Sequence, residues 1–544
     1  MSGLNLLVFR EGRQHANGQQ LKAALVGRLQ QSDGGYSHDA LLGALLLAGE
    51  LECGLADLDI EAAQSAEPLT DSIAAALLDK SAVDFKKLIG AAQIVPALDH
   101  LNISTPEGFA YYALHPLAYA DIEKISVPAK SLIVVGIRSI GTTLSAVTTA
   151  AARRNGIQAS RITVRPQGHP YNRAMEFLSN QLAAIQQAIA VDAWFAIVDE
   201  GPGLSGSSFL SVAEALERAG VPRENITLVS SHAPNADGLC SDNAASRWQR
   251  YRNVAVAGES RRPSEAQVFI GGGGWRTRLF ADRAAWPATW TSFERLKYLT
   301  AGDSAEPRLY KFAGFGHYGD RVFEREQAIA AAGFGPLPRR EADGFVSYPW
   351  MDGRAMSSRD LSKQVLERLA HYCAFRLREF PAELSNLGPL QQMAEHNLRE
   401  LGCDASVNLR LERPVIADGR MQPHEWMMTQ EDQILKTDSG SHGDDHFFPG
   451  LTDIAWDLAG AIVEWQMSEL QATEFLALYR SAGGDDASAR IDDFIKAYTI
   501  FRWAYSLMAA KAMNGSDEQI RFERAVDSYR ALLTKMDSCS LVSA

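Results

Sequence analysis

The sequence predicts an α/β protein with a parallel β-sheet in its first half. Four short apolar runs alternate with helical segments and Gly-rich turns, in the order SLIVVGI, RITVRP, AWFAIVDE and NITLVSSH. Such runs are typical of strands that crossover helices bury on both faces. At 544 residues and 46% apolar composition, the chain also exceeds one ordinary core, so we expect at least two domains.

Composition and charge narrow the function classes. The formal net charge of -13 argues against a surface that condenses on nucleic acid or anionic lipid. The five cysteines form no Cys-x-x-Cys pair, and no apolar run approaches the ~18–20 residues that span a bilayer. We therefore expect a cytoplasmic protein whose partners are small molecules, with no nucleic acid and no membrane. A homodimer is left open.

Changes in pattern divide the chain into three parts. Residues 1–100 carry apolar positions at helical spacing and are expected to form a mostly helical segment. The strand-rich part, 101–258, ends in a polar stretch, and we place its boundary near Gly258. The remainder, 259–544, closes with a helical tail for which packing is a sufficient explanation.

The segment AIVDEGPGLSGSSF carries the most informative chemistry. An apolar strand ends in Asp199 and Glu200 and then enters a loop rich in Gly and Ser. Glycines let backbone N–H groups close around an anion, serine hydroxyls add donors, and the next helix turns its N-terminus toward the same place. The sequence therefore predicts a monophosphate site. A strand that simply ends in a turn is the alternative.

This segment resembles the phosphoribosyl pyrophosphate motif of type I phosphoribosyltransferases, in which two acidic residues precede a Thr/Gly-rich phosphate loop of the same length. The resemblance implies that Asp199 and Glu200 contact the ribose hydroxyls. It also implies that phosphoribosyl pyrophosphate is the substrate and that Mg²⁺ accompanies it. The residues that would hold the 5'-phosphate are Gly203, Leu204, Ser205, Gly206, Ser207 and Ser208.

Further segments occur in the order that this family requires. The turn after SLIVVGI contains Arg138, Ser139, Gly141 and Thr142 and resembles the pyrophosphate loop, where Arg138 would stabilise the charge of the leaving group. RITVRPQGHPYNR stands where related enzymes carry a flexible loop that closes over the pyrophosphate. TPEGFAYYALHPLAYAD stands where they carry a base-recognising hood, although its aromatic residues are equally consistent with packing.

Residues from about 290 to 470 resemble, more weakly, aminoglycoside phosphotransferase-like kinases, which have an α+β fold with two lobes. RLYKFAGFG places Lys311 on a strand, where the resemblance implies contact with the phosphates of ATP. The next helix offers Glu324 or Glu326 as the partner of this lysine. GFVSYPWMDG resembles the hinge that meets adenine. Asp438 follows an apolar strand, as the metal-binding aspartate of that fold does.

The catalytic loop of that fold, His-Gly-Asp followed by Asn, is broken in this sequence. In IADGRMQPHEWM, Arg420 stands where the catalytic Asp belongs and Glu425 stands where the Asn belongs. Asp418 is close enough to act as the base instead. The triplet His-Gly-Asp does occur at residues 442–444, but no Asn follows at the right step, and we interpret it as a chance match.

Together these patterns predict a fused enzyme: a phosphoribosyltransferase that acts on an unknown acceptor, joined to a small-molecule kinase that would use ATP. The alternative is a regulatory protein that senses a ribose phosphate or nucleotide through two degenerate folds, and the broken catalytic loop favours it. Hydrolysis or phosphorolysis of a nucleotide is a third alternative, because it uses similar phosphate contacts.

Overall fold

The computed structural model describes most of the chain. The expected boundary at Gly258 and the last cysteine, Cys539, lie outside the described residues. In the part that is described, no helix is both long enough and apolar enough to cross a bilayer. The described residues are 4–8, 13–33, 37–58, 60–79, 83–125, 130–256, 261–302, 306–404, 406–444, 447 and 450–536.

The first hundred residues are mainly helical. The helix α2 is mostly apolar and is buried from Ala40 to Leu55, as expected of a helix that other elements enclose. A short antiparallel pair, β1 and β2, connects the two ends of this segment. The elements are β1 (Arg13–Ala16), α1 (Gly18–Asp33), α2 (His38–Leu58), α3 (Ile60–Leu78), α4 (Phe85–Ile94) and β2 (Leu101–Ser104).

A five-stranded sheet follows, in the order β4-β3-β7-β8-β9, and all its strands are parallel, which confirms the predicted sheet. The strand order reverses between β3 and β7. In open sheets of this kind, ligands bind outside the carboxyl ends of the strands at that point. The strands are β3 (Ser131–Ile137), β4 (Gln158–Val164), β7 (Trp194–Val198), β8 (Ile226–Ser230) and β9 (Arg252–Ala255).

Helices cover this sheet, and a small hairpin extends from it. The hairpin comes between β4 and the next helix and occupies the position of the expected flexible loop. The hairpin strands are β5 (Gln167–His169) and β6 (Asn172–Ala174). The helices are α5 (Glu107–Ala110), α6 (Ile122–Ile125), α7 (Ile140–Arg154), α8 (Ser179–Ile189), α9 (Ser207–Arg218) and α10 (Ala244–Trp248).

The second half begins with an antiparallel sheet in the order β10-β11-β12-β14-β13. One long helix, α12, follows β12 in the chain. The elements are β10 (Val268–Phe269), α11 (Arg276–Leu279), β11 (Lys297–Leu299), β12 (Arg308–Phe312), α12 (His317–Ala331), β13 (Arg339–Arg340) and β14 (Phe345–Pro349).

The rest of the second half is mainly helical and includes two small antiparallel sheets, β15-β17-β18 and β16-β19. The strands are β15 (Gly353–Ala355), β16 (Pro414–Ile416), β17 (Trp426–Thr429), β18 (Ile434–Lys436) and β19 (Leu451–Asp453). The helices are α13 (Lys363–Glu379), α14 (Gly388–Leu401), α15 (Ala455–Glu464), α16 (Glu469–Ser481), α17 (Ile491–Ala512) and α18 (Asp517–Met536). A sheet-rich lobe and a helix-rich lobe are thus present, as the two-lobed α+β expectation requires.

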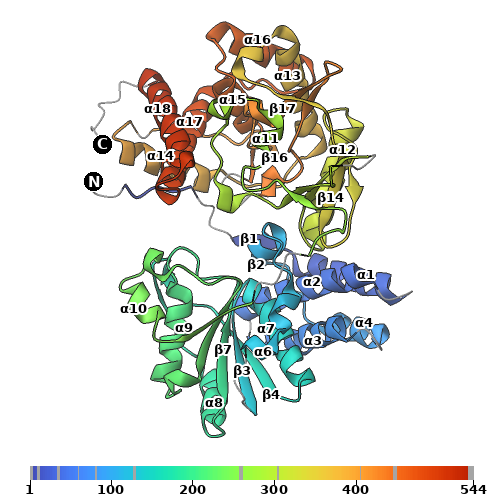
Figure 1. Cartoon of the computed structure of the whole chain (residues 1–544), viewed down its shortest axis with the longest axis vertical. Helices are drawn as coiled ribbons and strands as arrows, with labels where there is room; N and C mark the ends of the chain where they lie inside the picture. Colours follow the sequence, from blue (N-terminus) through green and yellow to red (C-terminus); the bar gives the residue numbers. More distant parts are fainter. Residues whose placement is uncertain are drawn as a thin grey trace.

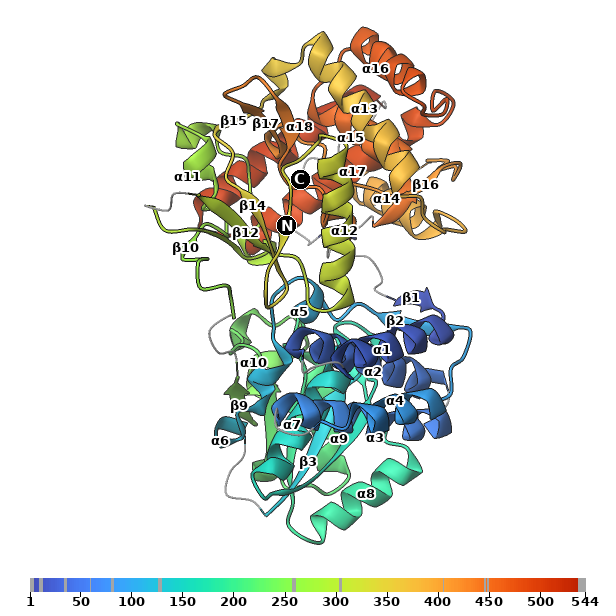
Figure 2. The ribbon, with the colours of Figure 1, turned by 90° about the vertical axis from the view of Figure 1, so that its right-hand side faces the viewer.

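The two halves share one apolar core. Phe312 and Phe315, beside α12, belong to the same cluster as Leu45 of α2. The backbones approach closely where α2 meets the start of α12, because a Cβ atom on Gly316 would lie 3.0 Å from Cα of Gly43. Figures 1 and 2 both place α1 and α2 beside the lower end of α12. The sheet-rich lobe is therefore anchored on the helical segment.

The start of the chain lies against the helix-rich lobe. The Leu7 N–H donates to Oδ1 of Asn397 at 2.9 Å, and Nδ2 of Asn397 donates to the Leu7 carbonyl at 2.8 Å. Val8 is fully buried in the core of this lobe. Figure 1 accordingly shows the first described residues near α14. Residues 4–8 thus pack with the second half, in contrast to the expected division at residue 100.

Candidate functional site

The acidic pair lies at the carboxyl end of β7, where the strand order reverses. Oε2 of Glu200 accepts the Gly108 N–H at 2.8 Å, and Oδ1 of Asp199 accepts the N–H of Glu200 at 2.9 Å. Tyr119 donates its hydroxyl to the Asp199 carbonyl at 2.6 Å. The structure thus holds both carboxylates at the position where a parallel sheet binds ligands.

Both carboxyl groups resist ionisation. Burial raises the pKa of Asp199 to about 7, and the cation of Arg165 only partly offsets this. Burial also raises the pKa of Glu200 to about 8, and the neighbouring charge of Glu107 adds to the effect. A raised pKa means that the ionised form of a carboxyl group lacks stabilising partners, and the hydroxyl groups of a ligand or a cation would supply them. Carboxyl groups with strongly shifted pKa values are found most often at functional sites.

The phosphate loop joins β7 to α9 through two glycines with positive φ. Gly203 has φ 59° and Gly206 has φ 71°, which is the left-handed region that a side chain rarely adopts. The hydroxyls of Ser205 and Ser207 both donate to the carbonyl of Pro170, at 2.8 and 2.6 Å. The loop therefore has the expected backbone form, while two of its hydroxyls hold the tip of the β5–β6 hairpin. Ser208 is half-buried and Leu204 is exposed.

The expected pyrophosphate loop joins β3 to α7. A Cβ atom on Gly141 would lie 2.7 Å from the Val198 carbonyl, so this turn can lie against β7 only with glycine there. Thr142 is buried, and Ser139 adopts a positive φ of 110°. Strain of this kind in a residue other than glycine is found most often at ligand sites.

The structure corrects the expected orientation of Arg138. Its Nη1 donates to Oδ1 of Asp57 at 2.8 Å, and Nη2 of Arg165 lies 2.7 Å from Oδ2 of the same carboxylate. Asp57 lies in the last turn of α2, and its pairing with these arginines was not visible in the local sequence. The cation that would meet the leaving diphosphate is thus already paired within the protein.

The second half contains a cleft of about 210 Å³ between the antiparallel sheet and the helix-rich lobe. Residues 348–351 form part of its wall, as expected of the hinge. Trp290, Phe447 and Tyr505 give one region of the cleft an aromatic lining. Another region is charged, with lysines from β11, β12 and β18 and with Asp438. A cleft with an apolar region and convergent charges is the usual form of a nucleotide or cofactor site.

The carboxylate of Asp438 forms ion pairs with two lysines of this cleft. Lys311 forms an ion pair with Oδ1 of Asp438, and Nζ of Lys297 lies 3.3 Å from Oδ2. Lys311 also donates to the hydroxyl of Ser441 at 2.7 Å. Burial opposes ionisation of Asp438, but the charges of Lys311 and Lys297 help to outweigh it, and the pKa of this carboxyl lies well below its usual range. Asp438 is therefore an anion that is ready to bind a cation.

The glutamate beside this ion pair is Glu326, and Glu324 is exposed on the outer face of α12. Oε1 of Glu326 accepts the Gly440 N–H at 2.8 Å, in the loop that follows Asp438. The choice of Glu324 as the binding residue is therefore corrected. The apolar residues Val322 and Ile329 are buried on the same face of α12 as Glu326. Their helical spacing from Glu326 could have shown from the sequence that this glutamate, and not Glu324, points inward.

Asp418 is fully buried, and both of its carboxylate oxygens accept hydrogen bonds. Oδ2 accepts the Tyr372 hydroxyl at 2.5 Å, and Oδ1 accepts Nδ1–H of His442 at 2.9 Å. Burial would raise its pKa, but Lys436 and His442 outweigh burial and hold this pKa far below the usual value. An anion with this many donors is a weak proton acceptor. The structure therefore does not support Asp418 as the general base.

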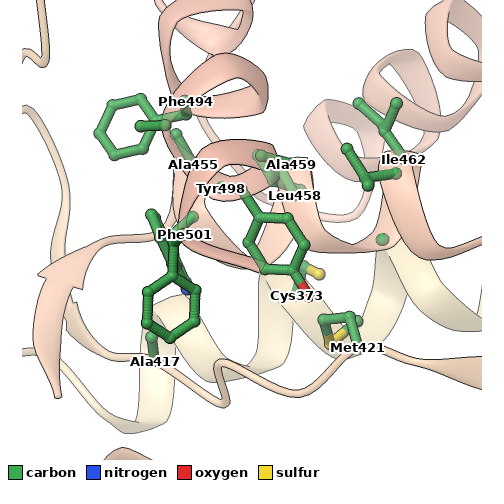
Figure 3. Packing of buried hydrophobic residues seen from close by; sticks show 14 of the residues in the cluster. Cys373, Ala417, Met421, Ala455, Leu458, Ala459, Ile462, Phe494, Tyr498 and Phe501 are labelled. Atoms are coloured by element: carbon green, nitrogen blue, oxygen red, sulfur yellow. The ribbon is translucent and has the colours of Figure 1, made fainter. Parts of the chain in front are cut away.

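A packed core supports the loop that contains Asp418. Asp457 accepts the N–H groups of Asp418 and Gly419, each at 2.8 Å. Figure 3 shows Ala417 and Met421 beside the apolar side chains of α15 and α17, including Tyr498. This fixed loop gives Arg420 and Glu425 defined places on the wall of the cleft.

His442 is the residue that sequence interpretation set aside and the structure brings into the site. Its Nε2 lies 3.4 Å from Oδ1 of Asp438, opposite the Nδ1 contact with Asp418. It also lines a second cavity of about 40 Å³, which shares Lys297, Arg420 and Asp438 with the main cleft.

The expected hood segment forms part of the wall of this second cavity. Tyr111 and Tyr112 line it, and the guanidinium of Arg295 lies 4.9 Å from the ring centre of Tyr111. Nη1 of Arg295 also donates to the Ala110 carbonyl at 3.1 Å. The segment that donates an N–H to Glu200 therefore also borders the charged region of the cleft.

Comparison with known proteins gives solved structures alone. No protein-family model matches the chain, and no curated protein matches it. A choline/ethanolamine kinase family protein from Mesorhizobium loti is 14% identical with a TM-score of 0.32, and covers 44% of this chain and 87% of its own. The macrolide 2'-phosphotransferase MphH from Brachybacterium faecium is 14% identical with a TM-score of 0.30, covering 47% and 95%.

A spectinomycin phosphotransferase, solved with ADP and spectinomycin, is 10% identical with a TM-score of 0.31, and covers 44% of this chain and 88% of its own. The names of these neighbours describe kinases or phosphotransferases. They give no support to a phosphoribosyltransferase in the first half. At these identities and TM-scores the similarity assigns no activity to this chain.

Proposed function

We propose that the second half binds ATP in the cleft and transfers its terminal phosphoryl group to a small molecule. The main support is the convergence of Lys311, Lys297 and Asp438 in the charged region of a cleft that also has an aromatic region. Ammonium groups neutralise phosphate oxygens, an adjacent carboxylate holds a divalent cation, and aromatic side chains accept a base. Enzymes that transfer a phosphoryl group from a nucleotide commonly combine groups of these kinds.

The transfer step depends on positioning and charge stabilisation more than on a strong base. Arg420 lines both cavities and would place a cation beside the phosphoryl group as its charge spreads in the transition state. Asp438 and Glu425 would hold the divalent ion. The arrangement therefore supports transfer without the aspartate that the resembling kinases carry at the position of Arg420.

The test is incubation of the full chain with ATP, a divalent cation and a metabolite extract, followed by mass spectrometry for phosphorylated products. Lys311→Met should abolish product formation and weaken ATP binding, because it removes the cation from the phosphate position. Lys363→Met, at the exposed start of α13, is the matched control and should behave like the wild type. Undiminished product formation by Lys311→Met would contradict the proposal.

We also propose that the first half binds phosphoribosyl pyrophosphate with magnesium and transfers its ribose phosphate to an unknown acceptor. The specific observation in favour is the acidic pair and glycine loop at the reversal point of the parallel sheet. Asp199 and Glu200 would accept hydrogen bonds from the ribose hydroxyls, and the amides of the loop and of α9 would receive the 5'-phosphate.

Isothermal titration with phosphoribosyl pyrophosphate, together with pyrophosphate release, tests this second site. Asp199→Asn/Glu200→Gln should abolish both signals, whereas the exposed Glu224→Gln should change neither. Binding without turnover, lost in the double variant, would favour the sensing alternative, with which the Arg138–Asp57 pair is compatible. Absence of binding would exclude the site.

A further inference from the structure

Two groups of His, Asp and Glu side chains in the described residues are close enough to share a metal ion. One consists of Glu425, Asp438 and His442, and the other of His38, His115 and Asp343. In each group, one potential ligand atom per residue lies within 4.8 Å of the other two. The hydrogen bonds of the histidines distinguish the two groups.

The group at His115 is closed to a metal. The Leu117 N–H donates to Nδ1 of His115 at 3.1 Å, so in the neutral ring the proton is on Nε2. Burial lowers the pKa of His115 to about 3, and the ring is therefore neutral. Nε2 lies 3.5 Å from Nε2 of His38 and is placed to donate a hydrogen bond to it. This pair is satisfied without an ion.

His442 has the opposite arrangement. Its Nδ1 faces the carboxylate of Asp418 at 2.9 Å and must be the donor, because an ionised carboxylate can only accept. In the neutral ring Nε2 carries the lone pair, and this atom lies 3.4 Å from Oδ1 of Asp438, where it could bind an ion. A carboxylate that orients the ring of a ligating histidine is the usual outer support of protein metal sites. The buried pair Asp418–His442 has this form.

The composition of the group at His442 indicates which ion it would take. We infer that Glu425, Asp438 and His442 form a site for a first-row transition-metal ion such as Mn²⁺, in preference to Mg²⁺. Mg²⁺ selects oxygen ligands in a strict octahedron, whereas an imidazole nitrogen raises the affinity for transition metals. Three ligands leave positions open for water or phosphate oxygens.

The surrounding charges are compatible with this site. Lys311 and Lys297 neutralise Asp438 in the structure, and Nζ of Lys436 lies 4.0 Å from Oε2 of Glu425. A divalent ion would take over the neutralisation of Asp438 and leave Lys311 and Lys297 to phosphate oxygens. The inference deepens the proposed phosphoryl transfer by naming its metal, but binding of the ion can be measured without nucleotide.

The test uses the full chain in metal-free buffer, without nucleotide. Loss of the electron paramagnetic resonance signal of free Mn²⁺ gives the affinity for Mn²⁺, and competition by Mg²⁺ gives the second affinity. We expect Mn²⁺ to bind more tightly than Mg²⁺. His442→Ala should weaken Mn²⁺ binding by about 10–100-fold or more, given the effect known for removal of outer partners alone. His371→Ala, at an exposed histidine of α13 away from the cleft lining, is the matched control and should keep the wild-type affinity.

A second measurement needs no variant and therefore does not depend on how well a substituted chain folds. Pulsed electron paramagnetic resonance of the wild-type protein with bound Mn²⁺ should show coupling to an imidazole nitrogen. Absence of this coupling, or equal affinities for Mn²⁺ and Mg²⁺, would overturn the inference. ATP binding that depends on Lys311 would survive such a result, so failure of the metal site and failure of the proposed kinase activity are distinguishable.

Discussion

At the scale of single residues, the acidic pair after β7 should oppose folding as the pH rises. The folded pKa values are about 7 for Asp199 and about 8 for Glu200. Both lie above the values of about 4 for unfolded chains, so the folded chain binds more protons in between. Stability from these groups is therefore present below about pH 4 and is lost as the pH rises to about 8.

Asp199→Asn/Glu200→Gln should for this reason be more stable than the wild type at about pH 8.5 and no more stable at about pH 4. The measurement is the thermal midpoint Tm, for which a gain of about 1 kcal/mol corresponds to about 1 °C in a chain of this length that unfolds cooperatively. Glu224→Gln, an exposed substitution, should leave Tm unchanged at both pH values. An equal Tm difference at both pH values would show that the pair is not held in its neutral form.

Glu326 and Glu324 provide a second contrast between single residues. Glu326→Ala removes the acceptor of the buried Gly440 N–H and should reduce the free energy of unfolding by about 1–3 kcal/mol. Glu324→Ala, on the exposed face of α12, should stay within about 0.5 kcal/mol of the wild type. Urea unfolding measures both. Equal losses would mean that the orientation of α12 differs from the one described.

Single residues also show which features of the protein could be predicted from the sequence and which could not. The strand that ends in Asp199 and Glu200, and the glycines after it, could be predicted because each strand and turn is encoded in neighbouring residues. The pairing of Arg138 with Asp57 and of Asp418 with His442 could not, because these partners lie far apart in the chain and only the fold joins them. A local resemblance therefore identified candidate positions but misjudged which charges are already paired.

At the scale of elements, the contact between α2 and α12 depends on two glycines. Gly316 has φ 55° and ψ -134°, and an added Cβ would lie 3.0 Å from Cα of Gly43. Gly316→Ala should therefore destabilise the protein both through backbone strain and by separating the two helices. Gly333→Ala is a matched control, because φ there is also positive, at 75°, but an added Cβ would have no heavy atom within 4 Å.

The expected cost for the control is about 1–2 kcal/mol, from the backbone conformation alone. Gly316→Ala should cost more than this, because it adds the close approach to α2 to a backbone conformation that is more strained for alanine. Urea unfolding of both variants gives the comparison. Equal losses would indicate that α2 and α12 adjust to the methyl group without strain.

At the scale of the whole molecule, the chain crosses between its halves twice. The core of the first half includes the aromatic residues beside α12, and residues 4–8 lie on the helix-rich lobe. Because of these two connections, we expect the halves to unfold in one cooperative transition, which differential scanning calorimetry would show as a single peak.

Asn397→Ala should weaken the second of these connections. Asn397 is fully buried, and its side chain forms hydrogen bonds with both the N–H and the carbonyl of Leu7. The substitution leaves these two backbone groups without their partner. Each group that stays buried should cost about 1–3 kcal/mol of unfolding free energy. The calorimetric peak should move to lower temperature, and it should broaden because the two halves of the chain unfold less cooperatively. Gln392→Ala, exposed on the same helix, should leave the peak in place. A peak for Asn397→Ala that matches the wild type in position and width would mean that the shared apolar core alone couples the two halves.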